Sequence, residues 1–330
     1  MMGLAIGDVV LANRTVLAPM SGISDLPFRR IAARFGAGLV VSEMVASDRL
    51  VAREVEAQLK ADGAGLGVHA VQLAGCRAGD LAEAARMAEA AGAHIVDINM
   101  GCPAKRVVGG WAGSALMRDV AHAASLVAAT VAAVRVPVTV KMRLGYDRAT
   151  RNAPELARLC EDAGATLITV HGRTRCQRYT GMADWHEVAR TRAATALPLV
   201  VNGDIDGVAT ARRALAACGA DAVMVGRASL GAPWLAGVIG AALAGTAPPV
   251  VPHTAAEVGA LALEHLEALV EHAGPERGLL LARKHVAAYA DRVEAPGALR
   301  RAALTAKGVR EARAATSALF AAADATRLAA

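Results

Sequence analysis

Up to about residue 242 the chain repeats one local pattern: a short β-branched, apolar run, then a loop, then an alanine-rich stretch with helical spacing. The apolar runs have no polar face, which is typical of a parallel sheet covered by helices on both sides. Several helical stretches end at a glycine that the next strand follows directly, and glycine allows the left-handed conformation of such a helix end. The predicted strands are Val16–Pro19, Leu39–Glu43, His69–Ala74, Ile95–Asn99, Val138–Met142, Leu167–His171, Leu199–Asn202 and Ala222–Gly226.

Eight strand–helix units in about 240 residues predict a (β/α)₈ TIM barrel. An open doubly wound sheet would normally carry a GxGxxG motif after its first strand, and this chain has none there. The predicted helices include Leu26–Phe35, Asp80–Ala91, Ser114–Val134, Pro154–Ala163 and Gly207–Ala217. We therefore expect a barrel over residues 1–243, a proline-rich linker over 244–252 and a small all-helical domain over 253–330.

The composition describes a globular protein with a large core, since 55% of the 330 residues are hydrophobic and 20% are charged. The N-terminus lacks the pattern of a signal peptide, and no apolar run reaches the roughly 20 residues of a membrane span. We expect a cytoplasmic protein without membrane contact. The five cysteines are scattered and form no CxxC pair, so neither a bound metal nor a disulfide framework is expected.

Positive charge is concentrated in the last part of the chain and on predicted loops. From residue 275 to the end there are ten Lys or Arg and five Asp or Glu, and the whole chain has a net charge of +6. Basic loops around a pocket together with a basic helical domain would suit a polyanion such as RNA, although ordinary surface charge would give a similar composition.

Polar residues stand at nearly every predicted strand end, where a (β/α)₈ barrel has its active site. These candidates are Pro19, Met20 and Ser21 after the first strand, Glu43 on the second, Gln72 on the third, Asn99 before Cys102 on the fourth, Lys141 and Arg143 on the fifth, His171 on the sixth, Asn202, Gly203 and Asp204 on the seventh, and Gly226 and Arg227 on the eighth.

The last two strand ends have the composition of a phosphate site. Glycines let backbone N–H groups approach a phosphate, and Arg227 adds charge. Gln72 and Lys141 are placed to grip a polar ring, and a lysine there would stabilise negative charge on a reduced flavin. A packed core amide and a surface lysine are the alternatives for these two residues. One phosphate and one polar ring together describe FMN.

Cys102 lies on a Gly-Cys-Pro turn directly after an apolar strand, a position suited to chemistry. A free thiol is largely protonated at neutral pH and can donate a proton, or act as a nucleophile if a cation lowers its pKa. The absence of a Cys-His-Asn or CxxC pattern favours the proton donor. Cys160 and Cys218 are interpreted as packing residues.

Ten sequence runs, in order along nearly the whole chain, closely resemble the bacterial tRNA-dihydrouridine synthases, and most of all their B-type branch. GCPAK combined with HGRTR is the most specific part of this resemblance. The runs are APMSGISDLPFR (18–29), VSEM (41–44), VQLAG (71–75), DINMGCPAKRV (97–107), AGSALM (112–117), PVTVKMR (137–143), HGRTR (171–175), NGDI (202–205), GRASLGAPW (226–234) and ARKH (282–285).

The resemblance implies a barrel that binds FMN and uses NADPH, or NADH, to reduce uridine in tRNA to dihydrouridine. Hydride would go to C6 of the base, and Cys102 would give a proton to C5. The residues implied to hold FMN are Pro19, Met20, Ser21, Gln72, Lys141, His171, Asn202, Gly203, Asp204, Gly226 and Arg227. The residues implied to contact the base or the RNA are Asn99, Lys105, Arg143, Arg173, Arg283, Lys284 and His285.

Two other functions compete with this one. One is a flavin barrel that reduces a free pyrimidine or another small molecule, but a small substrate gives no reason for a basic helical domain. A non-catalytic RNA-binding protein would have no reason to combine Cys102 with Lys141 and the phosphate loops. Aromatic residues make up only 3% of the chain, so we expect RNA recognition to depend on phosphates and shape.

Overall fold

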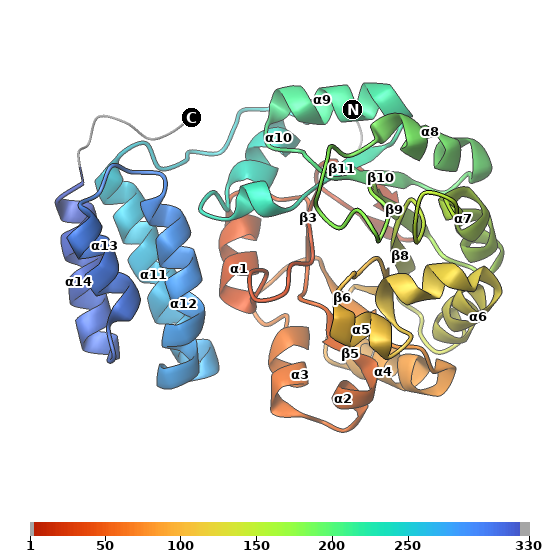
Figure 1. The fold of residues 1–330 in the computed structure, drawn as a ribbon, viewed down its shortest axis with the longest axis horizontal. Coiled ribbons are helices and arrows are strands. Elements are labelled where there is room, and N and C mark those ends of the chain that lie inside the picture. The colour runs from red at the N-terminus through yellow and green to blue at the C-terminus, as the bar shows by residue number, and fades with distance from the viewer. Residues whose placement is uncertain (1–2, 324–330) are drawn as a thin grey trace.

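The computed structural model describes residues 3–323 and contains a closed barrel of eight parallel strands, in which β11 pairs with β3 to complete the ring (Figure 1). The predicted (β/α)₈ fold is confirmed, and each predicted strand overlaps one barrel strand. The strands are β3 (Thr15–Leu17), β4 (Leu39–Val41), β6 (His69–Ala74), β7 (Ile95–Met100), β8 (Val138–Arg143), β9 (Leu167–His171), β10 (Leu199–Asn202) and β11 (Ala222–Val225).

Alternation along each strand decides which side chains reach the barrel interior. In β7, Val96 and Ile98 pack in the core between strands and helices, whereas Ile95 belongs to the interior cluster. Asp97 has the same orientation as Ile95, two residues on, and contacts side chains of both neighbouring strands. The same side of β7 therefore runs from an apolar residue to polar residues toward its carboxyl end.

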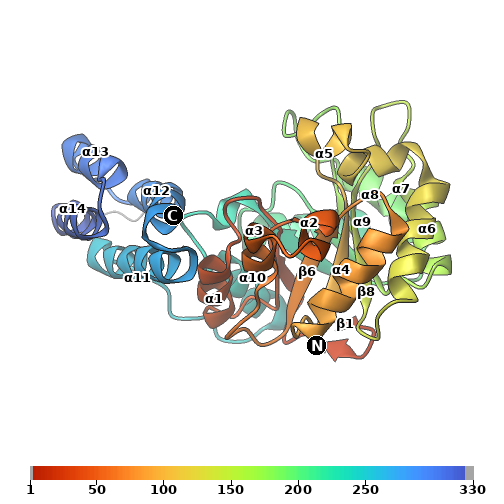
Figure 2. The same cartoon turned by 90° about the horizontal axis from the view of Figure 1, so that it is seen from below.

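A short antiparallel hairpin, β1 (Ala5–Ile6) and β2 (Val9–Val10), closes the amino-terminal end of the barrel. Leu4, Ile6 and Leu11 are buried in one cluster with interior strand residues such as Val16 and Ile95. Figure 2 shows β1 at the opposite end of the barrel from α5 (Lys105–Gly109), the helix that follows the Cys102 turn. Because one end is plugged with apolar side chains, a ligand would have to enter from the other.

The strands are covered by a ring of helices (Figure 1). Gly92, Gly164 and Gly219, which follow α4, α7 and α9, have φ of 93°, 93° and 64°, as the predicted helix ends require. The helices of this part are α1 (Leu26–Arg34), α2 (Ser47–Val51), α3 (Val55–Ala61), α4 (Ala78–Ala90), α5 (Lys105–Gly109), α6 (Val120–Val131), α7 (Ala153–Asp162), α8 (Trp185–Ala194), α9 (Val208–Cys218) and α10 (Leu235–Ala244), with 3₁₀ turns η1 (Gly113–Arg118) and η2 (Arg227–Ser229).

Two local predictions differ from the structure. The single helix predicted over Ser114–Val134 is divided into η1 and α6, because Asp119 leaves the helical conformation and its side chain accepts a hydrogen bond from His122 N at the start of α6. The second strand is also interrupted: β5 (Val45–Ala46) pairs with β6 beyond a break at residues 42–44. Glu43, predicted to end the strand, lies in this break.

Four helices follow the barrel: α11 (Ala255–Ala273), α12 (Pro275–Ala290), α13 (Gly297–Thr305) and α14 (Val309–Ala321). They lie beside α1 and α10 (Figures 1 and 2). Their apolar core also contains Ile31 and Trp234, which belong to the barrel part of the chain. Among residues 3–323, every helix is too short or too polar to cross a membrane.

Candidate active site

A cavity of about 960 Å³ opens at the carboxyl ends of the barrel strands. All sixteen barrel residues predicted to hold FMN, to act as catalyst or to contact the substrate line it, so residues from seven separate strand ends share one site. They are Pro19, Met20, Ser21, Gln72, Asn99, Cys102, Lys105, Lys141, Arg143, His171, Arg173, Asn202, Gly203, Asp204, Gly226 and Arg227. Glu43, the candidate on the second strand, does not line the cavity.

A chain of buried side chains forms the floor of the cavity. Asn99 Nδ2 donates to Gln72 Oε1 at 2.7 Å, and Gln72 Nε2 donates to Asp97 Oδ2 at 2.7 Å. The other carboxylate oxygen of Asp97 accepts from the Thr139 hydroxyl at 2.6 Å. These bonds determine which way the Gln72 amide faces. The sequence prediction missed Asp97, although a lone aspartate within the apolar strand IVDINM was a visible signal.

Burial raises the pKa of Asp97 to about 6, against the opposing effect of its hydrogen bonds. A carboxyl group with a folded-state pKa above its unfolded value binds more protons in the folded protein, so its contribution to stability falls as the pH rises from about 4 to about 6. We expect Asp97→Asn to abolish this part of the pH dependence. Between pH 4.5 and 7 the free energy of unfolding should fall by about 2 kcal/mol more in the wild type than in the variant.

Urea unfolding at a series of pH values measures this difference. Asp8→Asn, at an exposed aspartate in the β1–β2 turn, is the matched control and should follow the wild-type profile. Parallel profiles for wild type and Asp97→Asn would contradict the assignment.

The cavity carries several cationic side chains close together. Burial, and then repulsion from Arg143, lower the pKa of Lys141 to about 8, and its Nζ donates to Asn202 Oδ1 at 3.2 Å. Burial together with the nearby cations holds the pKa of His171 well below its usual value, so this imidazole is neutral at pH 7. Neighbouring positive charges thus make Lys141 and His171 harder to protonate. An anionic ligand bound here would relieve that repulsion, so the site is suited to an anion.

The turn after β10 requires its glycine. Gly203 has a φ of 112°, and a Cβ on it would lie 2.8 Å from His171 Cδ2. Asp204 also has a positive φ, of 54°. Its carboxylate accepts from Arg173 Nη2 at 2.6 and 2.8 Å and from Ala183 N at 2.7 Å. The Asp204 side chain therefore holds neighbouring loops together, and the backbone of the turn faces the cavity.

Two hydrogen bonds hold the backbone of Cys102 in place. Its N–H donates to Asn99 Oδ1 at 2.9 Å, and its carbonyl accepts from the Ser114 hydroxyl at 2.8 Å. Gly113 packs against it with a φ of 60°, where a Cβ would lie 2.9 Å from Cys102 O. The thiol forms no hydrogen bond within residues 3–323 and lines the cavity. By contrast, Cys160 and Cys218 are buried in the core, as predicted for packing residues.

Arg143 and Arg173, predicted to contact a substrate, are both 2% exposed. Arg143 donates from Nε to Gly101 O at 2.7 Å and from Nη1 to the carbonyls of Thr174 and Arg178 at 3.1 and 2.9 Å. Arg173 donates to Asp204 and to the carbonyls of Thr180 and Gly181. Both arginines thus hold the loops at the mouth of the cavity.

Sequence reasoning missed Tyr179, which lines the cavity and is 53% exposed. The guanidinium carbons of Arg143 and Arg227 lie 5.7 and 4.8 Å from its ring centroid. One of only three tyrosines, placed in the basic run RCQRYTG after HGRTR, was the available signal.

The three predicted RNA-facing residues of α12 do not line the cavity. Arg283 is half-buried and donates to Ala306 O at 3.0 Å, and Lys284 is exposed and donates to Gly22 O at 2.9 Å. The prediction for His285 needs correction: this side chain is 1% exposed and forms a 2.9 Å contact with Asp25. A side chain buried between α1 and α12 cannot contact RNA.

Two solved structures resemble this fold. The histamine dehydrogenase of Rhizobium sp. 4-9 aligns with 80% of this chain at a TM-score of 0.54 and 14% identity. A 2-naphthoyl-CoA reductase aligns with 74% at a TM-score of 0.57 and 14% identity. This chain spans about half of each of them, with 50% and 52% covered. At this identity the similarity concerns the fold.

Sequence comparison is more specific. A probable tRNA-dihydrouridine synthase of Rhodobacter capsulatus is 51% identical over 298 residues, which cover 89% of this chain and 91% of the relative. The tRNA-dihydrouridine synthase B of Xanthomonas axonopodis pv. citri is 46% identical over 288 residues, 87% of this chain and 86% of the relative. The family model for dihydrouridine synthase (Dus) matches residues 16–325. The resemblance inferred from the sequence runs is thus confirmed, and the chain belongs to the dihydrouridine synthase family.

Proposed function

We propose that this protein is a tRNA-dihydrouridine synthase that binds FMN in the barrel cavity and uses NADPH to reduce the C5=C6 bond of a tRNA uridine. The observation that supports this most is the convergence of sixteen predicted site residues on one cavity, in a chain of the dihydrouridine synthase family. Bound FMN would supply the hydride for C6 of the base.

The cavity has the donors that a flavin mononucleotide needs. Gln72 and Lys141 offer an amide and an ammonium at its floor, and Arg227 with the Gly203 turn offers charge and close backbone approach for a phosphate. We propose that Pro19, Met20, Ser21, His171, Asn202, Asp204 and Gly226 complete this binding site. Neutral His171 would then act as a hydrogen-bonding group without adding charge.

Cys102 is proposed to donate the proton to C5 of the uracil. Its thiol is free of hydrogen bonds in the described chain, and the Asn99 and Ser114 contacts hold its backbone at the cavity wall. Nη2 of Arg143 makes no hydrogen bond within residues 3–323, so this nitrogen is available to the base beside Asn99. The base must leave the tRNA stack to reach this depth.

The rim of the cavity supports RNA as the substrate. Lys105 lines the cavity, and Lys105, Arg106 and Arg148 are exposed and form no ion pair within residues 3–323. Trp111, which follows α5, is 63% exposed, so one of the few aromatic residues is free to contact RNA. We propose residues 1–243 as the catalytic barrel, 244–252 as a linker and 253–330 as the tRNA-binding helical domain. The cytoplasm is the expected compartment for this activity.

The protein is expected to bind one FMN, to oxidise NADPH and to form dihydrouridine in tRNA. The test is to reconstitute the protein with FMN, record its absorption spectrum and quantify dihydrouridine in tRNA from a strain lacking the gene after incubation with enzyme and NADPH. Position-by-position mapping of that tRNA also identifies the uridine. A preparation that cannot be reconstituted with FMN contradicts the proposal. Reduction of free uridine or uracil without reduction of tRNA would instead favour a small-molecule reductase.

A further inference from the structure

The β3–α1 loop, residues 18–25, forms one wall of the cavity through Pro19, Met20, Ser21 and Ile23. We propose that Lys284 and His285 of α12, together with His265 of α11, are positioning residues that hold this wall in place. Their effect on FMN binding rests on the proposed function, whereas their effect on the loop does not.

Two hydrogen bonds hold the tip of the loop at Gly22. Gly22 N donates to the Glu43 carboxylate in the break between β4 and β5, and Gly22 O accepts from Lys284 Nζ at 2.9 Å. Gly22 has a φ of 70°, and a Cβ on it would lie 2.7 Å from Lys284 Nζ. The glycine therefore gives the turn its conformation and lets the lysine approach. One contact comes from the barrel and the other from a helix 262 residues away.

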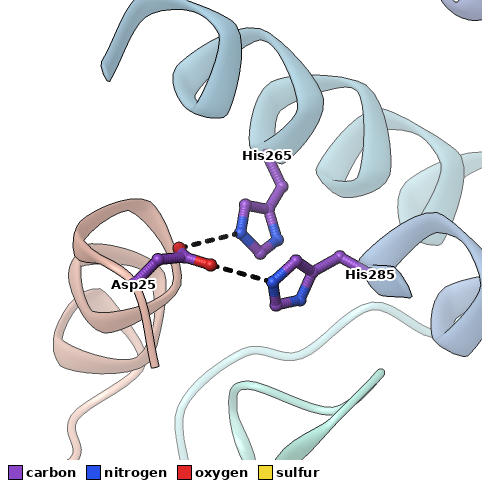
Figure 3. A group of neighbouring side chains, drawn as sticks. All are labelled: Asp25, His265 and His285. Carbon is purple, nitrogen blue, oxygen red and sulfur yellow. Dashed lines mark hydrogen bonds and ion pairs between the residues drawn. The ribbon is translucent and has the colours of Figure 1, made fainter. Parts of the chain in front are cut away.

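The end of the loop is held by a buried carboxylate, Asp25. Its Oδ1 accepts from Phe28 N at 2.9 Å and so caps α1. Its Oδ2 lies 2.9 Å from His285 Nε2, and His265 Nε2 lies 3.6 Å from Oδ1 (Figure 3). The Phe28 ring stacks on both imidazoles, with centroid distances of 5.8 and 5.3 Å.

The charge state of Asp25 agrees with its role as a hydrogen-bond acceptor. Burial alone would raise the pKa of Asp25, but the adjacent imidazoles of His265 and His285 lower it below its usual range. The carboxylate is therefore charged at neutral pH and remains a strong acceptor for its partner His285 on α12. Because all three side chains are buried, water cannot replace these contacts when one is removed.

Asp25, His265 and His285 also have the spacing of a metal site, since their candidate ligand atoms lie within 4.8 Å of one another. The direct contact between His285 and Asp25 and the cap on Phe28 account for both carboxylate oxygens without an ion. We therefore assign the contact between Asp25 and His285 to hydrogen bonding, and addition of zinc tests the metal alternative.

Residues of α12 that do not line the cavity therefore hold the β3–α1 loop, which forms one of its walls. Lys284→Met removes the contact with Gly22 and should weaken FMN binding to the apoprotein about fivefold. It should also accelerate hydrogen exchange in a peptide covering residues 18–25. Lys307→Gln, at an exposed lysine between α13 and α14, is the matched control and should match the wild type in both measurements.

His285 gives a second, independent comparison. His285→Ala removes the side-chain donor to Asp25 and should weaken FMN binding more than Lys284→Met does. His285→Gln retains an N–H donor and should restore most of the affinity. If His285→Ala does not fold, Lys284→Met and His285→Gln still decide the matter.

The outcomes separate the two proposals. A wild type that binds no FMN refutes the proposed function, and hydrogen exchange then tests the loop by itself. A wild type that binds FMN, with Lys284→Met equal to Lys307→Gln in both affinity and exchange, overturns the positioning role. If added zinc raised the melting temperature of the wild type but not that of His285→Gln, a metal site would replace the hydrogen-bonded assignment. A melting temperature that neither zinc nor EDTA changes supports the hydrogen-bonded assignment.

Discussion

Replacement of Cys102 by alanine is expected to lower dihydrouridine formation at least about 100-fold, the usual contribution of a positioned general acid. The same variant should bind FMN and accept electrons from NADPH like the wild type. The reason is that the thiol makes no hydrogen bond within the described residues, while the backbone bonds to Asn99 and Ser114 do not depend on it. The rates of flavin reduction and of dihydrouridine formation, measured separately, distinguish the two steps.

Cys176→Ala is the control for this variant, because Cys176 is an exposed cysteine on the loop after β9. It should retain full activity. Cys102→Ser should fall well below the wild type, since a hydroxyl is a far weaker acid than a thiol. Wild-type turnover of tRNA by Cys102→Ala would show that the proton comes from another group.

Replacement of Arg143 by glutamine is expected to destabilise the protein by about 3 kcal/mol as well as to reduce its activity. Arg143 donates to three main-chain carbonyls on two loops, and burial lowers its pKa only to about 10, so it stays charged at neutral pH. One of these carbonyls belongs to Gly101, next to Cys102. Urea unfolding gives the loss of stability, and kcat for tRNA reports on the displaced cysteine turn.

Arg148→Gln, at an exposed arginine on the loop after β8, is the matched control and should change stability by less than about 0.5 kcal/mol. Arg143→Lys should lie between the control and Arg143→Gln, because an ammonium cannot reach all three carbonyls. If Arg143→Gln raised KM without any loss of stability, Arg143 would be a substrate contact with no role in holding the loops.

The barrel and most of the cavity were predictable because both depend on local patterns. Apolar runs of four to six residues and glycine helix ends define the strand–helix units, and the closed barrel brings all carboxyl strand ends to one face. Residues such as Lys141 and Asn202 could therefore be assigned to one site without knowing their contacts. The 3.2 Å bond between them required the structure.

The failures came from contacts between distant parts of the chain. His285 stands in a run that resembles the family, but its partner Asp25 is 260 residues away, and no local pattern indicates which side of α12 is covered. Asp97 was missed because its donors come from neighbouring strands. The missed division between η1 and α6 has a different, local cause: Asp119 caps α6 through His122 N within an otherwise helical pattern.

The apolar core that Ile31 and Trp234 share with α11–α14 limits how this family can be recombined. An exchange of residues 253–323 between two relatives would place its junction in the proline-rich segment, yet the surface to be matched lies in α1 and just before α10. A chimera that keeps its packing must therefore take those barrel residues from the same parent as the helices. During evolution these barrel residues and the C-terminal helices should therefore change together. Substitutions at Ile31 or Trp234 should be accompanied by compensating changes in α11 and α12.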